Sequence, residues 1–137
     1  MADVEFTDNS ARVIAAMNHA VAAWLHESAN LLESQVKQNT AVDTGQTKGS
    51  WDFNVDESKR EAVVGSPLEN AIWEEFGTGE YALKGNGRKG GWFYVDAEGN
   101  GHFTHGKKPR RALFNAFESK KTDIVRRAEQ IMKSEMR

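Results

Sequence analysis

The clearest pattern in the chain is a stripe of apolar positions between residues 10 and 40. Its members recur at spacings of three and four residues, as on one face of an amphipathic helix: Val13, Ile14, Met17, Val21, Trp24, Leu25, Leu31, Leu32 and Val36. Roughly thirty residues at about 1.5 Å each predict a helix of roughly 45 Å. A helix of that length either lies across a whole sheet or offers part of its stripe to another subunit. Asp8, Asn9 or Ser10 is expected to cap its start.

The middle of the chain, residues 47–105, is predicted to be rich in short strands. Residues 50–55 alternate between apolar and polar side chains, which is the period of a half-buried strand, and residues 61–65 are its expected partner. Residues 92–95 and 101–104 flank a polar, glycine-containing turn and predict a second hairpin.

Two segments of the middle zone are less regular. Residues 70–76 fit a short helix or an irregular turn. Residues 84–91 are glycine-rich and basic with nothing to bury, and we expect this loop to be mobile in the isolated protein.

A second amphipathic helix is predicted over residues 109–135. Pro109 suits a first helical turn, because the N–H that proline lacks would be unpaired there in any case. Leu113, Phe117, Ile124 and Ile131 then follow helical spacing. A helix, antiparallel strands and a final helix predict an α+β fold, with both helices packed on a small antiparallel sheet in a single domain of residues 1–137.

Composition narrows the possible functions. The chain has 137 residues, enough for one core and too few for two. The formal net charge of -2 argues against a generic nucleic-acid binder, which usually carries a strong basic excess. Cysteine is absent, which excludes disulfides and thiolate metal sites. No segment has the pattern of a signal peptide or the roughly 18 apolar residues of a membrane span, so no membrane partner is expected.

Two short motifs match the sequence pattern of a dinucleotide site or a calcium site. Neither has the neighbouring residues or elements that binding requires. Residues 85–90 fit G-x-G-x-x-G, but a dinucleotide site needs a helix after the motif, and an aromatic strand is expected there. Residues 96–101 resemble half of a calcium-binding EF-hand loop, yet the position that must supply a bidentate acid is Lys107. A flexible loop and a hairpin turn are the favoured interpretations, and we expect no cofactor.

The candidate catalytic and metal-binding side chains are not spaced as an active site or a metal site requires. His102 and His105 lack a third ligand, and residues three apart on a strand face opposite sides. Glu74 and Glu75 are adjacent, so on a helix their carboxylates should diverge. The sequence therefore predicts a protein that is not an enzyme and holds no metal.

Residues 84–111 combine basic and aromatic side chains. That composition suits a surface that follows phosphates and stacks on bases, as in a small nucleic-acid-binding module. The alternatives are a solvated basic loop or a patch complementary to an acidic neighbouring subunit. The negative net charge of the chain favours these alternatives over specific nucleic-acid binding.

Three ordered segments carry a family resemblance: residues 41–45 (AVDTG), 70–79 (NAIWEEFGTG) and 105–116 (HGKKPRRALFNA). Together they resemble the small phage tail-component proteins, also called neck or tail-completion proteins. Residues 84–92 and 102–106 resemble an insertion found in members from Gram-positive hosts. The chain departs from the family at Ala41 and Arg111, where proline is common, and both losses remove local stiffness without removing a functional group.

The resemblance implies a virion protein, made in the cytoplasm of the bacterial host and assembling as a ring at the head–tail junction. Its partners would be other copies of itself, head-completion or connector proteins, and the tail terminator. The motif residues are expected to shape turns and are candidates for an assembly interface: Asp43, Thr44, Gly45, Glu75, Phe76, Gly77, Thr78, Gly79, Pro109 and Arg110. Fold-determining turns are the favoured role over direct partner contact.

Overall fold

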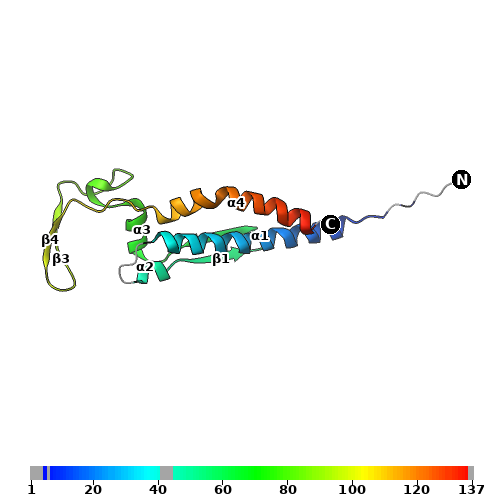
Figure 1. Ribbon diagram of the computed structural model, residues 1–137, viewed down its shortest axis with the longest axis horizontal. Helices are drawn as coiled ribbons and strands as arrows, with labels where there is room; N and C mark the ends of the chain where they lie inside the picture. The colour runs from blue at the N-terminus through cyan, green and yellow to red at the C-terminus, as the bar shows by residue number, and fades with distance from the viewer. Residues whose placement is uncertain (1–4, 6, 41–44, 136–137) are drawn as a thin grey trace.

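The computed structural model describes residues 5, 7–40 and 45–135 and has an α+β architecture, as predicted. The elements follow in the order α1 (Ser10–Asn39), α2 (Gln46–Gly49), β1 (Asp52–Asp56), β2 (Glu61–Gly65), α3 (Glu69–Phe76), the 3-10 turn η1 (Gly79–Tyr81), β3 (Trp92–Val95), β4 (Gly101–Thr104) and α4 (Ala112–Glu135). The molecule is elongated, with α1 and α4 antiparallel along its length and the β3–β4 hairpin projecting at one end (Figure 1).

Helices α1 and α4 form the main packing interface of the molecule. The Trp24 indole N–H on α1 donates to the backbone oxygen of Ile124 on α4, at 2.8 Å. The start of α1 is stabilised by the Asp8 carboxylate, which accepts the backbone N–H of Ser10 at 2.9 Å. At that end Ile14 is 56% exposed, so the apolar stripe extends beyond what the chain itself covers.

Strands β1 and β2 pair antiparallel and pack on α1. Their register places Phe53 opposite Val64 and Val55 opposite Ala62. Helix α4 packs chiefly on α1, so the hairpin does not fully cover α4. The second hairpin, β3–β4, forms a separate two-stranded sheet. The predicted strands therefore build two small sheets instead of one.

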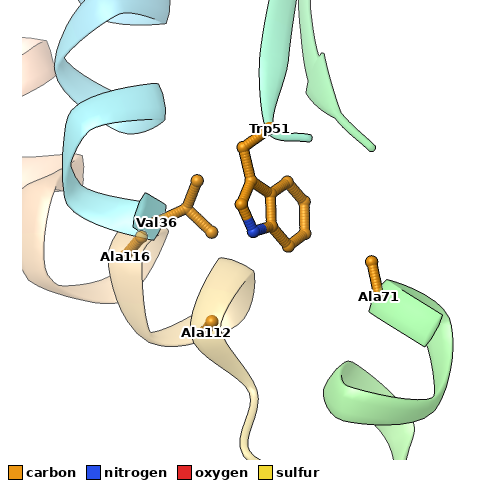
Figure 2. Close-up of a cluster of buried hydrophobic side chains, with 5 residues drawn as sticks. All are labelled: Val36, Trp51, Ala71, Ala112 and Ala116. Carbon is orange, nitrogen blue, oxygen red and sulfur yellow. The ribbon is translucent and has the colours of Figure 1, made fainter. Parts of the chain in front are cut away.

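The core lies where α1, α3 and α4 meet the start of β1, as Figure 2 shows. It consists of Val36, Trp51, Ala71, Ala112 and Ala116. The indole N–H of Trp51 donates to the hydroxyl oxygen of buried Thr40 at 2.9 Å, and that hydroxyl donates to the backbone oxygen of Val36 at 2.6 Å. Small alanines on two helices let the backbones approach around one large ring.

Helix α4 begins at Ala112, three residues after the predicted start at Pro109. The cause is a backbone contact that the local sequence does not reveal. The backbone N–H of Arg110 donates to the oxygen of Glu74 at 2.7 Å, and Arg111 has a φ of 57°, which is incompatible with a continuous helix. The segment before Ala112 is therefore tied to α3 and is not helical.

Candidate functional site

Two of the three family-motif segments meet at one place, which we call the motif junction (residues 74–80 and 105–111). It forms the base of the distal arm, defined as residues 77–111, which carries β3 and β4 (Figure 1). The backbone N–H of Thr78 donates to the oxygen of Lys107 at 2.9 Å, and the N–H of Lys107 donates to the Thr78 hydroxyl at 2.8 Å. The N–H of Glu80 donates to the oxygen of His105 at 2.9 Å. The junction therefore resembles a short stretch of sheet.

Glycines permit the close approach of the two segments. Gly77, Gly79 and Gly106 have φ values of 75°, 60° and 121°, which L side chains rarely adopt. A Cβ atom at any of the three would lie under 3.0 Å from a backbone atom of the facing segment. The fold of the junction therefore leaves no room for a side chain at these three glycines. A role of the motif residues in shaping turns or in an assembly interface stays a prediction.

Glu75 connects the junction to α4. Its side chain is buried, and its two carboxylate oxygens accept the backbone N–H groups of Leu113 and Phe114, at 2.7 and 3.2 Å. These donors belong to the first turn of α4 and have no partner within the helix. The carboxylate also lies at the positive end of the helix dipole. Glu75 therefore acts as an N-terminal cap supplied by another helix.

Glu74 and Glu75 diverge, as their adjacent positions on a helix require. The Glu74 carboxylate forms an ion pair with Lys107, across the junction. With one acid holding the arm and the other capping α4, this pair is arranged for structure and not for paired acid–base chemistry.

Pro109 and Arg110 complete the connection between the arm and the two long helices. The ring of Pro109 lies against Gly77, where a Cβ would come within 3.0 Å of it. The Arg110 Nε–H donates to the backbone oxygen of Asn39 at 2.9 Å, and the Asn39 amide donates to the oxygen of Ala112 at 3.1 Å. The end of α1 is thereby fixed to the start of α4.

The remaining predicted site residues are placed differently. Phe76 lies at the junction, with the Lys84 ammonium 4.7 Å from its ring centre. Gly45 precedes α2 with a φ of 81°, and a Cβ there would meet nothing within 4 Å, so it takes no part in the close packing of the junction. Asp43 and Thr44 lie outside the described residues.

Most basic side chains of residues 84–111 are already engaged within the chain. Their partners are the Phe76 ring for Lys84, Trp92 for Arg88, Tyr81 for Lys108, Phe114 for Arg111, the Glu74 carboxylate for Lys107 and the Asn39 oxygen for Arg110. Cations held over rings and carboxylates have fewer free directions for phosphates. The segment is thus better suited to anchoring the arm than to following a nucleic-acid backbone.

His102 on β4 and His105 in the motif junction contact different acids. His102 Nε2 lies 2.8 Å from Asp96, and His105 Nδ1 lies 3.3 Å from Glu80. The hydrogen bond with His102, followed by those from the loop backbone, lowers the pKa of Asp96 below its usual value. Within the described part of the chain, no three His, Cys, Asp or Glu side chains are grouped as metal ligands.

Gly106 in the junction and Asn39 at the end of α1, which accepts the hydrogen bond of Arg110, were not among the predicted site residues. Gly106 could have been found, because it stands inside the third motif segment beside Lys107. Asn39 carries no local signal: its role depends on Arg110, 71 positions away.

Comparison with models of known protein families shows which family the chain belongs to. Residues 5–77 match the model of the family described as "Bacteriophage HK97-gp10, putative tail-component". The chain belongs to this family. The match covers just over half of the sequence and ends at Gly77, where the arm begins. No curated protein and no solved structure gave a match.

Membership makes the protein a structural component related to the phage tail and places it in the virion among other phage structural proteins. The resemblance of residues 84–116 to the family lies beyond the matched range and stays a prediction. In the described residues, no helix combines the length and apolar character needed to cross a bilayer.

Proposed function

We propose that this tail-component protein acts without catalysis at the head–tail junction, where copies of it associate with one another and with the connector and tail-terminator proteins. The observation that carries the proposal is that large apolar side chains are exposed at several separate places on the chain. Ile14 on α1, Trp73 on α3 and Phe93 on β3 are 56%, 47% and 67% exposed. Two of these places are contiguous groups, Val13, Ile14 and Met17 on α1 and Phe93, Val95 and Phe103 on the β3–β4 hairpin. Contiguous exposed apolar surface of this kind is typical of proteins that bind other proteins.

The geometry of the candidate site supports a structural role. The charged side chains of Glu75, Glu74 and Arg110 each hold one element against another. An elongated body with a projecting arm offers different surfaces at its two ends. Contacts between unlike surfaces of successive copies are heterologous, and they close into a ring when the rotation between copies permits.

Deleting the gene from the phage or prophage that encodes it tests this role. The proposal predicts filled heads and separate tails that fail to join, and rescue by expression of the wild-type chain from a plasmid. Electron microscopy and infectivity measure both. Normal, infectious particles after deletion would contradict the proposal, and accumulation of empty heads would place the defect earlier in assembly.

A small nucleic-acid-binding module is the second candidate, motivated by residues 84–111. The contacts within the chain made by Lys84, Arg88 and Lys108 disfavour it. It predicts DNA or RNA binding that weakens steeply with salt, and a flat response would remove it.

A further inference from the structure

One face of the β3–β4 hairpin is an uncovered apolar surface, which we call the apolar plate (Phe93, Val95 and Phe103). The register pairs Phe93 with Phe103, and Val95 lies two residues along the same strand, so the three side chains share a face. They are 67%, 61% and 62% exposed. The Phe93 ring lies against Gly101, where a Cβ would have no room, so the ring can lie flat on the strand.

A hairpin of this kind is not expected to function uncovered. Two strands without a further layer are marginally stable in water, and a contiguous apolar surface on an exposed hairpin favours association. On the opposite face Arg88 lies over the Trp92 ring at 5.7 Å, and the neighbouring Tyr94 and His102 rings stack at 5.2 Å; on the plate the ring contact is that of Phe103 with the edge of His105, at 5.3 Å. The plate is thus the side that needs a partner.

The body of the molecule has a groove of matching character between β2 and α4, with a volume of about 390 Å³. Its lining is mostly apolar: Trp24, Leu32, Ala62, Val64, Phe117 and Ile124. It lies over α1, because β1 and β2 pack on α1 and α4 also makes its main contacts with α1. In the described part of the chain β2 pairs only with β1, so its other edge has backbone groups available to a further strand.

The charges of the arm and the rest of the chain are opposite. The arm (residues 77–111) carries seven Lys and Arg against three Asp and Glu, a net charge of +4. The other residues carry eleven against seventeen, a net charge of -6. The seven cations lie within residues 84–89 and 107–111, which flank the β3–β4 hairpin, while the hairpin itself holds Asp96 and Glu98. The opposition therefore favours the approach of one copy's arm to another copy's body through these flanking segments. The β3–β4 arm projects from the end of the body, away from β2 and from most of α4 (Figure 1). The plate and the groove lined by β2 and α4 are therefore expected to meet between copies.

The geometry points to docking of the distal arm of one copy in the β2–α4 groove of the next. The β3–β4 hairpin adds to the free edge of β2, and the two hairpins form one four-stranded sheet across both long helices. The apolar plate faces Phe117 and Ile124 and closes the groove. This inference rests on the proposed self-association and specifies its interface, in which strand addition supplies main-chain hydrogen bonds and the plate supplies apolar contact.

The absence of cysteine makes a site-specific cross-linking test direct. Val95→Cys and Ser28→Cys place one thiol on the plate and one at the groove, on separate chains that are then mixed and treated with a short bismaleimide. Docking predicts a covalent dimer from this mixture. Val95→Cys mixed with Thr122→Cys is the matched control, because Thr122 is exposed and lies away from the groove-facing side of α4, and little product is expected from it.

A second variant tests the energetics of the contact. Phe93→Ser with Phe103→Ser removes the two rings from the plate, while Tyr94→Ser alters the opposite face. Docking predicts at least a tenfold weaker self-association for the double variant, measured by light scattering over a concentration series, and a smaller change for Tyr94→Ser. Circular dichroism checks that α1 and α4 remain folded.

Three results would overturn the inference. If oligomers form without the Val95–Ser28 cross-link and the double variant keeps the wild-type mass, arm docking is wrong although self-association stands. If the wild-type chain stays monomeric at every concentration, self-association is wrong and docking fails with it. If the double variant leaves the oligomer unchanged and abolishes a salt-dependent binding of DNA, the plate is a nucleic-acid surface instead.

Discussion

The contact between Glu75 and the start of α4 gives the most sharply defined prediction. Replacing Glu75 with alanine removes the acceptor for the backbone N–H groups of Leu113 and Phe114, which lie at 2.7 and 3.2 Å from its oxygens. Because Glu75 is only 6% exposed, water cannot readily replace the carboxylate. The first turn of α4 would then hold donors with no acceptor.

The expected loss of stability follows from the kind of bond. A hydrogen bond to a charged group contributes about 1.5–3 kcal/mol, and loss of a helix N-cap costs about 0.5–2 kcal/mol. Removing a buried carboxylate also relieves its desolvation, which offsets part of the loss. We therefore expect Glu75→Ala to lower the free energy of unfolding by about 3 kcal/mol. Glu75→Gln, which keeps one acceptor oxygen, should cost about 1 kcal/mol.

Urea denaturation followed by circular dichroism measures both values, and hydrogen exchange at the first turn of α4 reports the local effect. Glu118→Ala is the control, because that exposed side chain pairs only with Lys121 on the surface of α4 and should cost less than about 0.5 kcal/mol. Equal stability of Glu75→Ala and Glu118→Ala would refute the capping role.

Three further predictions concern the junction, the core and the second hairpin. Gly79→Ala should destabilise the protein by more than about 2 kcal/mol in urea denaturation, because its φ and its close backbone contact both exclude a Cβ, whereas Gly49→Ala, with open space, should change stability by about 1 kcal/mol at most. Trp51→Phe leaves the buried Thr40 hydroxyl without its donor and should cost about 2 kcal/mol in the same assay. The hydrogen bonds that lower the pKa of Asp96 stabilise the hairpin loop when its carboxyl group is ionised. This stabilisation is complete above about pH 4, and it is lost as the pH falls through the lowered pKa of Asp96. Amide exchange in that loop, followed by NMR, should therefore accelerate only in acid; equal rates at pH 6 and pH 2, after correction for intrinsic exchange, would contradict this.

The periodicity of apolar residues predicts a helix or a strand correctly where the element is determined by its own residues. The stripe from Val13 to Val36 predicts α1, and the alternation at Trp51, Phe53 and Val55 predicts a half-buried strand, because burial on one face imposes the helical or strand period directly. The predicted α+β class is confirmed for the same reason.

The start of α4 and the motif junction depend on distant partners, and the sequence could not place them. Pro109 is a good first helical residue by local rules, but Glu74 binds the backbone there and Glu75 caps the helix three residues later. The four strands form two sheets because the β1–β2 hairpin does not pair with the β3–β4 hairpin. The alternation of apolar and polar residues along a strand does not specify which strand lies beside it. The sequence identified the motif segments without showing that two of them form one structure.

The central claim, that this phage tail component works by associating with copies of itself, is tested most directly by its mass in solution. Light scattering behind a sizing column, over a series of protein concentrations, gives that mass without a label or a partner. The account predicts a discrete oligomer whose mass is a whole multiple of 15.3 kDa and whose population rises with concentration. A mass of one chain at every concentration would contradict it.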